Sequence, residues 1–255
     1  MYKIFKLSLA TAVRQKSVFL VLLLLAVLPF VLQQMTNIEV DPAVSSPAIA
    51  QAAWQLVWAG ACFWLVYNAA NMGGEHVRSR LGEYFLSNGV SKSSQLCGLW
   101  LTTLLFAVLM VVVAVMVCVF AAAPSGETEW RHWLVLNLQH AVFFLVVVSA
   151  VNQFVIALAS RFGALVGYSG GLFLYLCGFY LVLVVEKIVL SKDIFMLDTL
   201  YVILPHFYLA DLTHRFVHQQ GALTTSEFFG VFEYLAGLSI LLSVCAYLNF
   251  TPKQK

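Results

Sequence analysis

The chain has 255 residues, of which 62% are hydrophobic and only 10% are charged. Soluble domains carry about a quarter charged residues, so this composition excludes an ordinary soluble protein and predicts a membrane protein. The formal net charge of +2 gives no reason to expect a nucleic-acid partner.

Six stretches contain no Asp, Glu, Lys or Arg and are long enough to cross a bilayer, which takes roughly 20 helical residues. Their apolar character is continuous and lacks the alternation of a membrane barrel, so we expect helices. The predicted spans cover residues 17–36, 48–70, 94–122, 133–160, 163–187 and 228–250. The predicted fold class is therefore an all-α membrane protein with six transmembrane helices.

The basic residues set the predicted orientation. With the N-terminus inside, ten of the fourteen Lys and Arg residues lie in cytoplasmic segments, and four lie in outer ones: Arg131, Lys187, Lys192 and Arg215. This positive-inside bias predicts that both termini are cytoplasmic.

Residues 1–16 place Tyr2, Phe5, Leu9 and Val13 three to four positions apart, with basic residues largely elsewhere. This spacing predicts an amphipathic helix at the inner membrane surface. The alternative is a plain basic flank before the first span. Trp54 and Trp58 lie near the outer end of the second span, a position typical of an interfacial aromatic belt.

A charged segment separates spans two and three. We predict a short cytoplasmic helix over residues 75–87, because Gly73-Gly74 and Asn88-Gly89 supply a breaker before it and a C-cap after it. Leu81, Tyr84 and Phe85 would share one face of that helix. The alternative is a solvated loop that only satisfies the positive-inside rule.

Span four carries five polar residues, and two interpretations of them stay open: a translocation path, or hydrogen bonds between helices. These residues are Asn137, Gln139, His140, Asn152 and Gln153. Span five opens with Gly163, Gly167 and Gly171, a spacing that permits close helix packing within the bundle or across a dimer.

Residues 188–227 form the longest outer segment, which is apolar and aromatic and is broken by Pro205. We expect it to dip into the outer leaflet or to pack over the span ends as short helices. Thr224 and Glu227 then form a capping-box pattern for span six.

The sequence lacks the residue patterns needed for ATP hydrolysis and for metal binding. No Walker A pattern occurs, so this chain has no such route to ATP hydrolysis, and no cluster with metal-ligand spacing is present. Gly167-Tyr-Ser169-Gly170 and Trp130-Arg131 are similar to motifs of rhomboid intramembrane proteases. A serine nucleophile needs a histidine base, however, and span six contains no histidine.

A stronger resemblance covers nearly the whole chain. The coupling segment of type-2 ABC-transporter permeases usually reads E-x-x-x-G-T-L-E-x-L-L-S-x-P-V-S-R, and residues 75–94 read EHVRSRLGEYFLSNGVSKSS. Residues 203–212, ILPHFYLADL, are similar to the family's "iPnfxlfdl" stretch before the last span. The chain departs from the family at Gly82 and at Asn88-Gly89, where a proline is common.

This resemblance implies a permease subunit of the bacterial cytoplasmic (inner) membrane. Such a subunit has no catalytic residues and binds no cofactor itself. ATP would be used by a partner, a cytoplasmic ABC ATPase, and a second permease subunit would complete the transporter. The residues implied in ATPase coupling are Glu75, Arg78, Arg80, Leu81, Glu83, Tyr84 and Phe85. A rhomboid-like protease and a membrane anchor that transports nothing are the alternatives.

Overall fold

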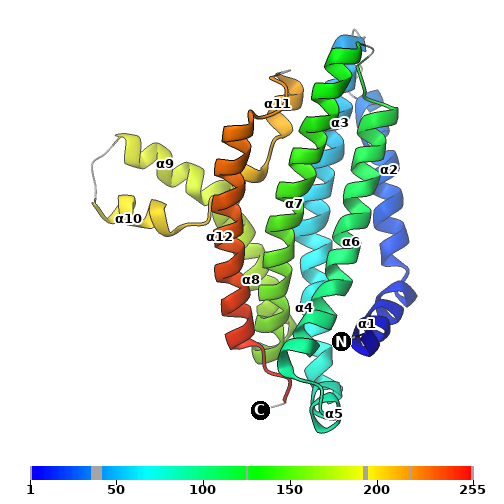
Figure 1. The fold of residues 1–255 in the computed structure, drawn as a ribbon, viewed down its shortest axis with the longest axis vertical. Helices are drawn as coiled ribbons and strands as arrows, with labels where there is room; N and C mark the ends of the chain where they lie inside the picture. The colour runs from blue at the N-terminus through cyan, green and yellow to red at the C-terminus, as the bar shows by residue number, and fades with distance from the viewer. Residues whose placement is uncertain (1, 36–41, 125, 192–194, 219, 254–255) are drawn as a thin grey trace.

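The computed structural model describes residues 2–35, 42–124, 126–191, 195–218 and 220–253, and every regular element in them is helical (Figure 1). The first half of the chain contains α1 (Tyr2–Arg14), α2 (Ser17–Met35), α3 (Pro42–Gly60), the π-helix η1 (Ala61–Leu65), α4 (Val66–Arg78), α5 (Leu81–Ser87) and α6 (Lys92–Phe120). The second half contains α7 (Glu127–Phe162), α8 (Ala164–Leu176), the π-helix η2 (Cys177–Leu181), α9 (Val182–Ser191), α10 (Phe195–Ile203), the 3₁₀ helix η3 (Phe207–Ala210), α11 (Thr213–Val217) and α12 (Thr225–Asn249). Some positions used in the predictions lie outside the described residues. They are residues 1, 36, 192–194 and 219 of the predicted segments, and Lys192 and Lys255 among the basic residues counted for orientation.

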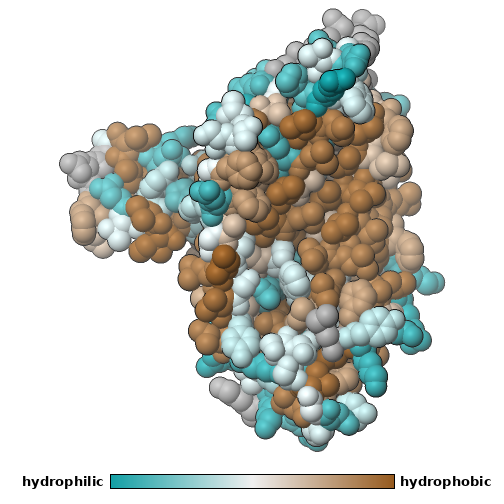
Figure 2. Space-filling view, in the orientation of Figure 1, coloured by the Kyte–Doolittle hydropathy of each residue, from teal (hydrophilic) through white to brown (hydrophobic). Residues whose placement is uncertain are grey.

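Five of the described helices are long and apolar enough to cross a membrane, and a sixth is added if α1 and α2 form one bent span. The five cover Pro47–Arg78, Lys92–Phe120, Glu127–Phe162, Ala164–Ser191 and Thr225–Asn249. Figure 2 shows hydrophobic side chains over the middle of the visible face and hydrophilic ones gathered toward both ends. The prediction of an all-helical, multi-pass membrane protein is confirmed at this level, with five to six such helices.

The N-terminal helix and the first span meet at a sharp angle. α1 bends by 67° from the first part of α2, and the non-glycine residue Lys16 adopts a positive φ of 57° at the junction. α1 also packs against α6. It is thus placed across the end of the bundle, as an interfacial helix would be.

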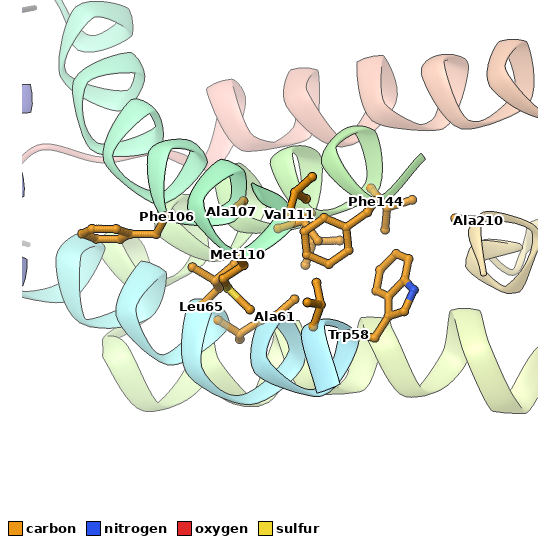
Figure 3. Packing of buried hydrophobic residues seen from close by; sticks show 14 of the residues in the cluster. Trp58, Ala61, Leu65, Phe106, Ala107, Met110, Val111, Phe144 and Ala210 are labelled. Atoms are coloured by element: carbon orange, nitrogen blue, oxygen red, sulfur yellow. The ribbon is translucent and has the colours of Figure 1, made fainter. Parts of the chain in front are cut away.

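Helix α7 is the central helix of the bundle, because it packs against α4, α6, α8 and α12 (Figure 1). Around it, Leu65 and Ala61 face Met110 of α6, while Trp58 lies beside Phe144 of α7 (Figure 3). Ala210 of η3 belongs to the same buried cluster, so the outer segment contributes to the core.

Two spans contain a single π-helical turn, η1 in span two and η2 in span five. Such turns insert an extra residue and are frequent at functional sites. At η2, a Cβ on Gly178 would collide with the ring of Phe207, so this glycine lets η3 lie directly against span five.

The described residues of the segment 188–227 divide into two parts. η3 and α11 fold into the bundle, where Phe207 and Phe216 are buried and α11 packs against α3. α9 and α10 instead form a hairpin that projects sideways from the bundle, and we call it the arm (Figure 1). Phe195 and Leu190 on the arm are 82% and 81% exposed.

Candidate functional site

The charged segment between spans two and three forms the end of α4, a turn and the separate helix α5. We call this segment, residues 75–90, the elbow. The prediction of one helix over 75–87 is therefore wrong. α4 continues to Arg78, and α5 covers Leu81–Ser87. Gly73 and Gly74 do not end a helix. A Cβ on Gly73 would collide with the carbonyl group of Ile156, so this glycine instead permits close packing of α4 on α7.

The elbow turns at Ser79 and Arg80. The N–H groups of both still bond to the last turn of α4, at Glu75 O and Val77 O. Arg80 then has a φ of 57°, a left-handed conformation that is uncommon for a non-glycine residue. This reversal gives α5 its own direction below the ends of the spans (Figure 1).

The predicted C-cap of α5 is confirmed. Gly89 has a φ of +78°, and the Val90 N–H donates to Phe85 O across the cap. This is the six-to-one bond of a Schellman motif, which glycine favours because it has no Cβ. Ser91 is then the N-cap of α6, with its hydroxyl accepting from the Ser94 N–H.

Gln95 joins the elbow to the bundle. Its side chain is fully buried, and its amide nitrogen donates to Gly82 O at 3.3 Å and to Val90 O at 3.2 Å. Its amide oxygen lies 2.7 Å from Nε2 of His76 in α4. Because the nitrogen already donates to two carbonyls, the oxygen accepts, and the His76 Nε2–H donates. One side chain of α6 therefore connects α4, α5 and the loop after α5.

The residues after span six close the elbow from below. Phe250 stacks on His76, with ring centroids 6.2 Å apart, and Phe85 of α5 stacks on the same ring at 6.2 Å. A Cβ on Gly82 would collide with the carbonyl oxygen of Pro252. The Thr251 N–H also donates to Ser160 Oγ of α7 at 3.0 Å. α5 thus contacts α4 at His76 and the residues after α12 at Pro252, and those residues are in turn bonded to α7.

The structure divides the predicted coupling residues into two groups. Glu75, Arg78, Arg80 and Tyr84 are exposed, and Glu75 pairs with Arg78 at 3.5 Å. Leu81, Glu83 and Phe85 are half-buried, and Leu81 and Phe85 turn toward a cavity beneath α1. Leu81, Tyr84 and Phe85 therefore do not form one shared docking face.

Sequence reasoning missed His76 and Gln95, which have the most buried polar contacts of the elbow. The available signal was a glutamine four residues after the N-cap Ser91, at the start of an otherwise apolar run. An amide at that place needs a partner once it is buried.

The polar residues of span four bond within the bundle. Trp54 Nε1 donates to Asn137 Oδ1 at 2.9 Å, and Trp58 Nε1 donates to His140 Nε2 at 3.0 Å. Trp54 also stacks on His140, with ring centroids 4.1 Å apart. The aromatic-belt prediction for both tryptophans is wrong, because Trp54 is 0% and Trp58 8% exposed and each indole N–H has an internal acceptor.

The other three polar residues of span four differ from one another. Gln139 holds the loop before α12, donating to Leu223 O at 3.0 Å and accepting from Leu223 N at 2.8 Å. Asn152 is fully buried, and neither side-chain polar atom has a hydrogen-bond partner among the described residues. Gln153 is half-buried. Asn137 and His140 thus bond to another helix, which favours the interhelical interpretation for these two, while Gln139 bonds to a loop.

Two of the three predicted packing glycines lie in a tight helix contact. A Cβ on Gly167 would lie 2.6 Å from Ala159 Cβ, and one on Gly171 would lie 2.6 Å from Val155 and Val66. Gly163 instead forms the turn between α7 and α8, with a φ of +96° and open space around it. The contact is within the chain, between α8 and its neighbours α7 and α4.

The serine of the rhomboid-like motif lacks a catalytic arrangement. Ser169 is exposed, and its hydroxyl donates to Leu165 O at 2.9 Å. His206, in the outer segment, bonds through Nδ1 to the Tyr234 hydroxyl at 2.9 Å. These contacts give no support to a serine–histidine pair.

Comparisons with known proteins return no match: no family model, no curated protein and no solved structure matches the chain.

Proposed function

We propose that this chain is the permease subunit of an ATP-driven type-2 ABC exporter, working with a separate ATPase and a second permease subunit in a cytoplasmic membrane. The observation that carries the proposal is the elbow. A short helix lies beyond the ends of the spans, directly after the exposed residues Arg78 and Arg80, and is tied to the spans through buried side chains.

The elbow has the two properties that a transmission element needs. Its outer surface offers Arg78, Arg80 and Tyr84, and Tyr84 is 61% exposed. Arginine and tyrosine are typical anchors of protein interfaces. Its inner surface is fixed by Gln95 and His76, so a displacement of α5 is passed to α4 and α6.

In this proposal, closure of the ATPase pair pushes α5, and spans two and three follow. Coupling requires two states in which the partner and the spans make different contacts. Because α4 packs on the central helix α7, a shift of the elbow would extend to the whole bundle. The transported substrate would pass at the interface of two permease subunits.

The experiment reverses the two exposed charges of the elbow. The double variant Arg78→Glu, Arg80→Glu should lower co-purification of the ATPase that binds the unaltered chain by about tenfold or more, equivalent to about 1.4 kcal/mol. Membrane insertion should be unchanged, because both side chains are exposed. Lys6→Glu, an exposed reversal on α1, is the matched control and should bind the ATPase normally.

Undiminished ATPase binding by the double variant would overturn the assignment of the elbow. Absence of any ATPase that co-purifies with the unaltered chain would overturn the permease proposal itself and favour the anchor alternative.

A further inference from the structure

A cavity lies between the N-terminal helix and the elbow. It encloses about 110 Å³, and its walls come from α1, α4, α5 and α6. A single water needs roughly 10–15 Å³ by the same kind of measure, so the cavity admits a small polar group of several heavy atoms but no large ligand.

The charged group that lines the cavity is negative. Glu75 is the one acidic residue among those that line the cavity, and no lysine or arginine lines it. Ser8, Gln15 and Asn71 add hydroxyl and amide groups, while Leu7 and Leu81 supply apolar wall. This combination suits a cationic hydrogen-bond donor attached to an apolar body.

The carboxylate of Glu75 is accessible to such a donor. Its described ion pair with Arg78 spans 3.5 Å between largely exposed side chains. Exposed pairs of this kind contribute little to stability, so a bound cation can share or replace the contact.

Basic residues lie beside the cavity on the outer flank of α1. At 100° per residue, Lys3 and Arg14 fall within ~40° of Leu7, at the edge of the cavity-facing stripe. Both are exposed, whereas Lys6 lies ~100° from Leu7 on the far side of the helix. A ligand with a cation inside the cavity and an anion at its mouth matches this order of charges.

The position of α1 indicates where such a ligand comes from. An amphipathic helix with basic residues lies at the level of lipid headgroups, and the 67° bend before α2 places α1 across the bundle. We propose that the cavity binds the headgroup of a phospholipid with a primary amine, such as phosphatidylethanolamine. The ammonium group contacts Glu75 and Asn71, and the phosphate lies at the mouth of the cavity, on the basic flank of α1.

The same chemistry separates this lipid from its relatives. A primary ammonium donates three hydrogen bonds to the acceptors of the cavity, whereas the trimethylammonium of phosphatidylcholine donates none. Phosphatidylglycerol brings no cation to Glu75. The site is therefore selective for the amine and does not depend on the transport proposal.

The experiment is native mass spectrometry of the purified full chain in detergent, without any ATPase, titrated with each of these three lipids. We expect phosphatidylethanolamine to bind about tenfold more tightly than phosphatidylcholine, a difference of about 1.4 kcal/mol. Glu75→Gln should abolish this preference, and Asn71→Leu should reduce it. Glu233→Gln, a change at an exposed carboxylate on α12, should leave it intact.

Equal binding of the three lipids, preference for phosphatidylglycerol, or an unaltered preference in Glu75→Gln would each overturn the lipid site. Because Glu75 is exposed, loss of folding does not obscure the result. Since no ATPase is present, a negative result here would leave the permease proposal standing, and failure of ATPase binding would leave the lipid site standing.

Discussion

The elbow and the arm are both segments outside the straight part of the bundle, yet they are held in opposite ways. The elbow is short and charged, and buried groups of α4, α6 and the residues after α12 fix it in place. The arm is apolar and exposed, and its base forms a small hydrophobic cluster of its own, made of Cys177, Val182, Val185 and Leu204. A force on the elbow is passed to the bundle, whereas the arm can shift without disturbing the main core.

Each end of the bundle has a glutamine, and the hydrogen bonds of the two glutamines differ in the same way as the elbow and the arm. Gln95 connects three elements at the elbow, while Gln139 holds one loop, at Leu223, near the opposite end of the bundle. The elbow is therefore a joint between several elements, and the outer contact is a local tether. Three experiments test this contrast, in order of the expected effect.

The largest effect should come from packing beside the elbow. Gly73→Ala places a Cβ against the carbonyl group of Ile156, where both partners are helix backbone. Overpacking of this kind costs about 1–3 kcal/mol or more, so the midpoint of thermal unfolding in detergent should fall. Gly178→Ala at the base of the arm meets the side chain of Phe207 and no backbone atom of it, and should cost less because that side chain belongs to the short helix η3 rather than to the central helix.

Gly237→Ala is the matched control, because nothing lies within 4 Å of its new Cβ and alanine favours a helix. Equal midpoints for Gly73→Ala and Gly237→Ala would contradict the tight contact between α4 and α7.

A smaller and more local effect should follow loss of the joint. Gln95→Leu removes the partners of Gly82 O, Val90 O and the His76 N–H. Because α5 can open locally and let these groups bond to water, the net loss is about 1 kcal/mol. Amide exchange over α5 should rise about tenfold or more, as measured by hydrogen–deuterium exchange. Gln139→Leu should raise exchange only around Leu223, and unchanged exchange in α5 of Gln95→Leu would show that the joint is not needed.

The smallest effect should be a pH dependence at the base of the arm. Burial lowers the pKa of His206, against weaker raising contributions from a hydrogen bond to Leu204 and from the nearby charge of Glu186. The fold thus favours the neutral ring, so its contribution is complete above the unfolded value of about 6.5 and is lost as the pH falls toward the lower folded pKa.

Between pH 7 and pH 5, amide exchange corrected for its intrinsic rate should therefore rise in α10 and stay constant in α5. His206→Phe removes the titrating group and should remove the difference. A rise of equal size in both helices would indicate general loosening of the bundle.

The all-helical fold and the approximate spans could be predicted from the sequence, because uncharged apolar runs are a direct consequence of the bilayer as solvent. The capping box at Thr224 and Glu227 and the glycine cap at Gly89 were also predictable, since each depends on a few neighbouring residues. Local signals of this kind need no knowledge of tertiary contacts.

The elbow itself was harder to predict because its form depends on distant partners. Gly73 was interpreted as a helix breaker, but its use is set by Ile156, and the roles of Gln95 and Gly82 depend on His76 and Pro252. Trp58 was assigned to the membrane interface for the same reason. A sequence shows that an indole N–H needs an acceptor, but not that His140 supplies it.

The contact between Gly82 and Pro252 has a consequence for biogenesis. The elbow lies between the second and third spans, yet its lower support is made only after the sixth span has left the ribosome. During synthesis, α5 therefore lacks its contact with Pro252 until the residues after α12 have been made.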